Sequence, residues 1–103
     1  MVVWTDNAIS NITEFIDNAE EDTENIAKLY MSKLIDYADI LENMPELGKK
    51  LEFVISNYEI RQIIYKKHRI IYHIRKKDIV ILAILHGKLD IDQALKKLKR
   101  QIN

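Results

Sequence analysis

Arg61, Arg69 and His86 are the side chains of this sequence best suited to chemistry. An arginine guanidinium keeps its charge and binds phosphate or carboxylate groups, and a histidine can act as a general acid or base near neutral pH. Each residue also has a structural interpretation. Either arginine can be an exposed strand residue facing an acid or water, and His86 can simply mark where the apolar run LAILHGK leaves a sheet. Glu59, the nearby lysines and the tyrosines would support such a site.

Other kinds of reactive centre have little support in the sequence. There is no cysteine, which excludes disulfides, thiolate metal sites and cysteine nucleophiles. The only glycines are Gly48 and Gly87, so there is no glycine-rich phosphate loop, and no His-Glu-x-x-His helix is present. The histidines are dispersed over predicted strands. We therefore expect neither a metal site nor a cofactor.

The candidate residues belong to a run of predicted strands rich in Ile, Val and Tyr. Pairs of lysines separate these strands, and such short spacing predicts antiparallel hairpins. The run IVILAIL lacks alternation between apolar and polar residues, which indicates a central strand covered on both faces. The predicted strands span residues 51–55, 59–65, 68–75 and 78–85.

The simplest register joins the last three strands by two-residue loops at the lysine pairs. It places Arg69 opposite Ile84 and His86 opposite Lys67. Because side chains alternate between the two faces of a sheet, Arg61 falls on one face unless a bulge intervenes. The other face then carries Arg69, His73 and His86.

A strand and two amphipathic helices are predicted before these strands. The strand spans residues 1–4, and the first helix begins at a cap formed by Thr5 or Asp6 and ends near Glu20. Apolar residues recur in this helix at three- and four-residue spacing. They are Ile9, Ile12, Phe15, Ile16 and Ala19.

The second helix is predicted to begin at Asp22 or Thr23 and to end before Pro45, since proline cannot continue a helix. A turn follows at Pro45-Glu46-Leu47-Gly48. A last helix is predicted from Asp90, where Asp90 and Gln93 resemble a capping box. The predicted apolar stripe of the second helix consists of Ile26, Leu29 or Tyr30, Leu34, Tyr37 or Ala38, and Leu41.

This order of elements predicts one α+β domain over residues 1–103. An N-terminal strand and a helical hairpin would pack on an antiparallel β-meander, followed by a short C-terminal helix. The start lacks the basic and apolar regions of a signal peptide, and the longest apolar run, residues 79–85, is too short to span a bilayer. We therefore expect a cytoplasmic protein that does not enter a membrane.

The charged residues are divided between the two halves of the chain. Residues 1–46 carry eleven acids and two lysines, whereas residues 47–103 carry fourteen bases and five acids, although the whole chain is neutral. A basic half attracts phosphate or an acidic protein segment, and the alternative is that solvated faces merely segregate by sign. The cations that we predict to contact a partner are Lys66, Lys67, Arg75 and Lys88.

Several segments, taken in order, resemble the RelE/ParE superfamily of type II toxin–antitoxin toxins. The Pro-Glu-Leu-Gly turn, the Arg-x-x-Tyr of residues 69–72 and the last strand followed by His-Gly are most similar to the ParE branch. The resemblance covers nearly the whole chain. The segments are WTDNA at 4–8, MPELGKK at 44–50, IRQII at 60–64, HRIIYHI at 68–74 and IVILAILHGK at 79–88.

The resemblance implies a small sheet with two N-terminal helices packed on it, and a cognate antitoxin that forms a hetero-oligomer with the toxin. It also implies one of two activities. ParE-type toxins inhibit DNA gyrase by binding it, whereas RelE-type toxins cleave mRNA in the ribosome. The leading hypothesis is a ParE-like toxin; the alternatives are a RelE-like endonuclease or a binding module with neither activity.

In a RelE-like endonuclease, the resemblance would make Arg61, Arg69 and His86 catalytic, with Arg69 facing the scissile phosphate. Cleavage through a 2′-hydroxyl needs a base, an acid and cations around the phosphate. Arg69 and His86 supply one cation and one acid–base group, which is an incomplete set. Several active relatives have a tyrosine at or just after the position of His86, where this chain has Gly87 and Lys88. The ParE-like hypothesis is therefore favoured.

Overall fold

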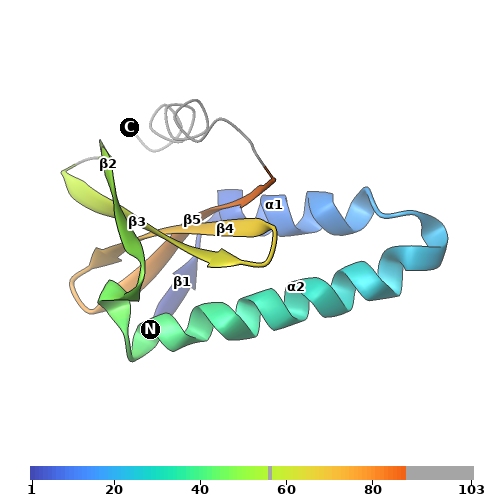
Figure 1. The fold of residues 1–103 in the computed structure, drawn as a ribbon, viewed down its shortest axis with the longest axis horizontal. Helices are drawn as coiled ribbons and strands as arrows, with labels where there is room; N and C mark the ends of the chain where they lie inside the picture. Colours follow the sequence, from blue (N-terminus) through green and yellow to red (C-terminus); the bar gives the residue numbers. More distant parts are fainter. Residues whose placement is uncertain (56, 88–103) are drawn as a thin grey trace.

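The computed structural model describes residues 1–55 and 57–87 of the chain, and Figure 1 shows how its elements are arranged. Lys88 and the predicted last helix lie outside the described residues. The strands are β1 (Val2–Trp4), β2 (Lys49–Ile55), β3 (Tyr58–Tyr65), β4 (His68–Arg75) and β5 (Asp78–His86). The helices are α1 (Asp6–Asp17) and α2 (Glu24–Ala38), with 3₁₀ turns η1 (Glu21–Thr23), η2 (Asp39–Glu42) and η3 (Pro45–Leu47).

The strands form one five-stranded sheet in the order β1-β5-β4-β3-β2. β1 pairs parallel with β5, and the other pairs are antiparallel, as the meander prediction required. β5 lies between two neighbours and is buried along most of its length, which confirms that IVILAIL is an interior strand. The two helices lie together on one side of the sheet (Figure 1), so the predicted α+β architecture is confirmed.

Helix α1 is attached to β5 by polar side chains at its start. Thr5 caps the helix, since its hydroxyl accepts from the backbone N–H of Ala8 at 3.2 Å, and the same hydroxyl donates to the carbonyl of Ile81 at 2.8 Å. Asn7 donates to the carbonyl of Leu82 at 2.9 Å. These bonds fix the beginning of α1 over the middle of the sheet.

A bulge in β5 corrects the predicted register. Ile71 pairs with Ala83 but Tyr72 pairs with Ile81, so Leu82 is an extra residue on its strand. As a consequence Arg69 lies opposite Leu85 rather than Ile84, and His86 lies opposite His68 rather than Lys67. The two-residue loops at the lysine pairs were predicted correctly; the bulge was not.

Side chains of α1 bind the backbone groups that the bulge leaves outside the ladder. The carbonyl of Leu82 accepts from Asn7, and the N–H of Ile84 donates to Asn11 Oδ1 at 2.9 Å. A buried backbone group without a partner would cost free energy comparable to a lost hydrogen bond. The two asparagines, one helical turn apart, therefore stabilise the irregular strand.

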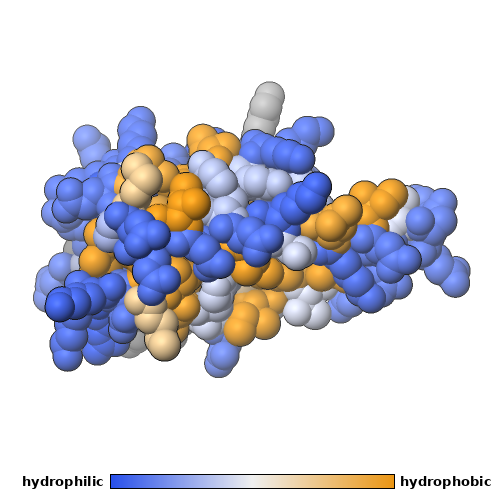
Figure 2. All heavy atoms as spheres, turned by 90° about the horizontal axis from the view of Figure 1, so that it is seen from below, coloured by the Kyte–Doolittle hydropathy of each residue, from blue (hydrophilic) through white to orange (hydrophobic). Residues whose placement is uncertain are grey.

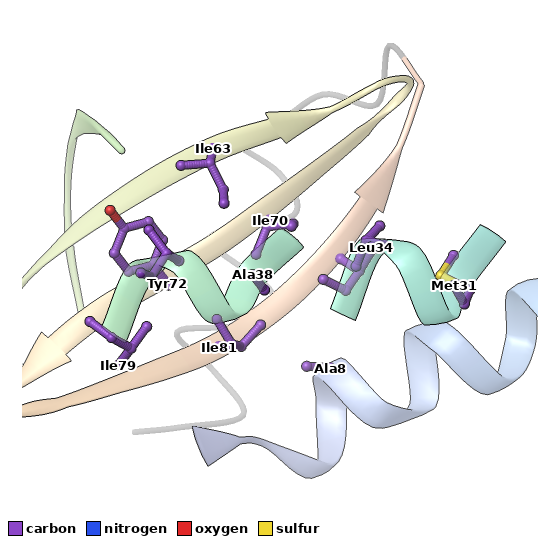
Figure 3. Packing of buried hydrophobic residues seen from close by; sticks show 11 residues of the cluster. Ala8, Met31, Leu34, Ala38, Ile63, Ile70, Tyr72, Ile79 and Ile81 are labelled. Atoms are coloured by element: carbon purple, nitrogen blue, oxygen red, sulfur yellow. The ribbon is translucent and has the colours of Figure 1, made fainter. Parts of the chain in front are cut away.

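The main core lies between the helices and the sheet. Leu34 of α2 and Tyr72 of β4 are fully buried, and Met31 is nearly so (Figure 3). Burying a side chain of this size contributes roughly 1.5–3 kcal/mol. The cluster comprises Ala8, Met31, Leu34, Ala38, Leu41, Ile63, Ile70, Tyr72, Ile79, Ile81 and Ile84.

Both helices differ from the predicted stripes in their N-terminal turns. In α2 the buried residues include Ala27 and Met31, whereas Ile26 and Leu29 are 67% and 58% exposed. Leu34, Ala38 and Leu41 are buried as predicted. In α1, Ala8 is buried and Ile9 is 49% exposed, while Ile12, Phe15 and Ile16 pack against the core as expected. The physical reason is that small residues let the helices approach the sheet closely, so the larger neighbours point outward.

The turns of the β3–β4 and β4–β5 hairpins each begin with a lysine in the left-handed backbone region. φ is +53° at Lys66 and +58° at Lys76, a conformation that side-chain-bearing residues adopt at a cost of about 1–2 kcal/mol. Glycine or asparagine would adopt it more readily.

No helix within residues 1–55 and 57–87 is long and apolar enough to cross a membrane.

Candidate functional site

Arg61 holds the turn between the helices and the sheet. Its Nη1 donates to the carbonyl of Gly48 at 2.9 Å and, at 3.5 Å, to that of Glu46. Tyr72 binds the same turn: its hydroxyl donates to the carbonyl of Pro45 at 2.7 Å and accepts from the N–H of Gly48 at 2.8 Å. The Arg61 guanidinium therefore serves this structural role within the described chain.

Arg69 lies on the opposite face of the sheet from Arg61, as predicted. It is half-buried, and its Nη1 lies 3.4 Å from Gln62 Oε1 on the neighbouring strand. His73 shares the face of Arg69, again as predicted. His86 does not: the bulge moves it to the helix-covered face, beside His68. The structure thus separates Arg69 from His86 and brings no two of the three predicted catalytic side chains together.

His86 instead belongs to an aromatic cluster at the end of β5. Its ring lies 4.6 Å from that of His68, centroid to centroid, and 6.0 Å from that of Phe15. Phe15 also meets His68 edge-on at 5.0 Å. The cluster lines a hollow of about 410 Å³ with Asn11, Glu14, Asn18, Ala19, Met31 and Ile84.

His68 is the buried member of this cluster. Only 2% of its surface is exposed, and its Nδ1 lies 2.7 Å from the hydroxyl of Tyr30. Burial, together with the nearby His86, lowers the pKa of His68 to about 4, and burial raises the pKa of Tyr30. Both groups are therefore neutral at pH 7. We did not predict this pair from the sequence, because helical and strand periodicity carry no signal for a contact between residues 30 and 68.

The predicted partner-binding cations are divided between two ends of the sheet. Lys66 and Lys67 form the turn beside His68 and His86, and the N–H of Gly87 donates to the carbonyl of Lys67 at 3.0 Å. Lys66 Nζ lies 5.7 Å from the centroid of the Tyr30 ring. Arg75 lies at the other end of β4, over Tyr58 at 6.0 Å. Lys88 is outside the described residues.

Gly87 follows β5 directly and has φ of +73°. We expect Gly87→Ala to lower the free energy of unfolding by about 1 kcal/mol, because alanine is strained in this conformation although nothing lies within 4 Å of its Cβ position. Gly87→Asn is the matched control, since asparagine tolerates the left-handed region, and it should cost less. Urea denaturation measures both; equal losses would assign the effect to something other than backbone strain.

Among residues 1–55 and 57–87, no group of three or more histidine or acidic side chains is placed to hold a metal ion. The described site combines half-buried aromatic rings, including that of Tyr30, with the buried His68 and a lysine turn. Such a surface is suited to contacts with another macromolecule. It offers Glu14, His86 and the lysines as its exposed charged or titratable groups.

A comparison of the sequence with protein-family models gives one match. The model described as "ParE toxin of type II toxin-antitoxin system, parDE" matches residues 2–91. The match includes all described strands and both helices. No curated protein matches the chain.

Proposed function

The chain belongs to the ParE toxin family of type II toxin–antitoxin systems, and from this premise we propose that it arrests growth by binding and inhibiting DNA gyrase. Family membership implies an antitoxin partner. We further propose that this antitoxin neutralises the toxin in a hetero-oligomer and that both act in the cytoplasm, where gyrase acts.

The separation of Arg69 from His86 is the observation that supports binding rather than RNA cleavage. A general acid or base must lie within hydrogen-bond reach of the atoms that react, and the cations must surround the same phosphate. Here the two side chains lie on opposite faces of one sheet, and Arg61 is bonded to the Gly48 turn. A binding activity requires no such convergence.

The basic half of the sequence supports the antitoxin proposal. Lys66 and Lys67 lie together in the turn at one end of the sheet, so an acidic antitoxin segment would find matching charge there. We propose that these two lysines, together with Arg75 and Lys88, contact the antitoxin.

A supercoiling assay with purified gyrase tests the proposed activity. We expect the toxin to block supercoiling. The antitoxin, sought as the protein of an adjoining reading frame, should relieve the block if it covers the surface that binds gyrase. No inhibition at large toxin excess would contradict the gyrase proposal.

The endonuclease alternative has its own readout. A translating extract programmed with a defined mRNA and read by primer extension would reveal cleavage. Cleavage that Arg69→Ala or His86→Ala abolishes would establish the alternative, whereas cleavage unaffected by both substitutions would exclude these residues as its catalysts.

A further inference from the structure

The hollow at the end of β5 is apolar in its buried part and polar where it opens to solvent. Met31 and Ile84 are its buried apolar members, whereas Glu14, Asn18 and His86 are exposed. With a volume of about 410 Å³, the hollow can receive one large side chain of a partner. Sites of this kind bind the apolar part of a ligand inside and orient it by a few polar groups.

The polar groups of the hollow include two acceptors that suit a cationic donor. Of the described residues that line it, only Glu14 carries a formal charge, and its carboxylate accepts hydrogen bonds. His68 Nδ1 lies 2.7 Å from the hydroxyl of Tyr30, which in turn can donate to the carbonyl of Tyr65 at 3.5 Å. In the tautomer that donates from Nδ1 to Tyr30, the lone pair of His68 Nε2 is left without a partner among the described residues. This nitrogen is therefore an acceptor for a ligand.

Three aromatic rings beside these acceptors favour a flat cation. Phe15 meets His68 edge-on at 5.0 Å and lies 6.0 Å from His86, and the two imidazoles are 4.6 Å apart. Aromatic faces attract cations. A guanidinium group is flat, stacks on such rings and has five N–H donors but no acceptor. An arginine side chain therefore matches both the rings and the acceptors of the hollow.

The charges around the hollow favour a cation as well. Helix α1 has no basic residue in its last turn, and the carboxyl end of a helix carries partial negative charge. The connection from α1 to α2 is at the right of Figure 1, and in Figure 2 the surface there is mostly hydrophilic. Its exposed acids are Asp17, Glu20, Glu21 and Asp22.

The lysines of the β3–β4 turn do not line the hollow, although the turn begins beside its histidines. Lys66 Nζ instead lies over the rings of Tyr30 and Tyr65, at 5.7 Å and 5.5 Å from their centroids. An acidic antitoxin segment at this turn would be attracted by the lysines and repelled by Glu14. The turn and the hollow thus favour partner groups of opposite charge.

We propose that the hollow receives an arginine side chain of the toxin's protein target. The proposal rests on the proposed function, namely that the toxin acts by binding a protein. Arginine is common among the few residues that dominate binding at protein interfaces, where it fills a pocket of the partner. In this arrangement Glu14 and His68 Nε2 accept from the guanidinium, and Phe15 packs against it.

Binding of a single side chain is the first test. N-acetyl-arginine amide is titrated into the ¹⁵N-labelled full chain, with N-acetyl-citrulline amide as the uncharged control of nearly the same shape. We expect a saturable shift of the Phe15 and His86 amide resonances with the arginine probe, and at least fivefold weaker binding of the citrulline probe. Equal binding of the two probes would overturn the proposal. So would the absence of a saturable shift up to about 100 mM, where a site with a Kd of about 10 mM is mostly filled.

Growth arrest and antitoxin capture, measured on the same full-length variants, are the second test. Glu14→Gln removes the carboxylate, and Phe15→Leu removes the ring while keeping an apolar side chain. Asp36→Asn is the matched control, because it neutralises an exposed acid of α2 that does not line the hollow. Circular dichroism establishes that each variant is folded, and Glu14→Gln changes only an exposed side chain.

We expect Glu14→Gln and Phe15→Leu each to need about fivefold more toxin for the same growth arrest. The control variant, and antitoxin capture by all three variants, should stay within about twofold of wild type. Unchanged arrest by Glu14→Gln would overturn the proposal. Loss of antitoxin capture in the hollow variants would also overturn it and would assign the hollow to the antitoxin.

Failure of the proposed function gives a different pattern. A wild-type chain that arrests growth with the expected dependence on Glu14, but does not inhibit gyrase, would refute gyrase as the target and leave the arginine site standing. A folded wild-type chain that does not arrest growth would refute both proposals. A wild-type mass of a dimer that Glu14→Gln reduces to a monomer would show a second copy as the occupant and overturn the target proposal.

Discussion

Gly48→Ala is expected to lower the free energy of unfolding by about 2–4 kcal/mol, the range of overpacked or disrupted buried sites. A Cβ at Gly48 would lie 2.6 Å from Tyr72 Cε1 and 2.8 Å from Cζ, distances that real Cβ atoms do not show. The tyrosine cannot yield easily, because it is fully buried and its hydroxyl is bonded to Pro45 and to Gly48 itself. Urea denaturation measures the loss.

A double-mutant cycle with Tyr72→Phe separates steric conflict from the lost hydrogen bonds. Tyr72→Phe alone should cost about 1–3 kcal/mol, since it leaves the buried N–H of Gly48 without its acceptor. The double variant should be less destabilised than the sum of the single variants by more than about 0.5 kcal/mol, because the removed hydroxyl is part of the clash. Strict additivity, or a cost of Gly48→Ala below about 0.5 kcal/mol, would contradict the packing described for this turn.

His68 is expected to make the stability of the protein fall as the pH is lowered from about 7 to about 4. Burial, and secondarily His86, lowers the pKa of His68 to about 4, from an ordinary value of 6.5. Between these values the unfolded chain binds a proton that the folded chain does not, so stability rises with pH there and is constant above it. The full shift corresponds to a loss of about 3 kcal/mol at the acid end.

His68→Gln is the informative control for this prediction. Glutamine has no titrating group but still offers an acceptor to the Tyr30 hydroxyl, so the dependence on pH between 7 and 4 should become shallower. Burial and Arg75 also lower the pKa of His73, so some slope should remain. NMR titration of the His68 imidazole measures the group directly. A pKa above 6 would contradict the buried, neutral histidine.

The strands and turns were predictable because their signals are local. Lys66-Lys67 and Lys76-Lys77 interrupt β-branched runs, and the structure places two-residue turns at both. The cap of α1 was predicted at Thr5 or Asp6, and the structure has it at Thr5, whose hydroxyl acts within one helical turn. The resemblance to ParE toxins, based on ordered segments of sequence, is confirmed by the family match.

The position of His86 was not predictable, because it depends on one extra residue in β5. The run IVILAIL has no alternation, so nothing in it marks Leu82 as the bulge. The partners of the bulge, Asn7 and Asn11, lie on a helix more than seventy residues earlier. The face on which His86 lies therefore depends on contacts with a distant helix. For this reason His86 does not share the face of Arg69 and His73, as had been predicted.

In α2 the prediction was wrong at Ile26 and Leu29, for a different reason. This helix has two apolar stripes, and hydrophobicity alone favours Ile26 and Leu29 over Ala27 and Met31. Close packing favours the smaller set, because alanine lets a helix approach the sheet. The same ambiguity explains why Ile26 and Leu29 remain exposed.

The pairing of β1 with β5 also bears on how the protein is made. Thr5 donates to the carbonyl of Ile81, 76 residues later, so the start of the chain has no strand to join until β5 has been synthesised. At about 5–20 residues per second a ribosome needs about 4–15 s for that interval. During this time the nascent chain can form its helices but cannot close its sheet. Such long-range closure slows folding as well. A chain released before β5 has been made would therefore lack the finished sheet.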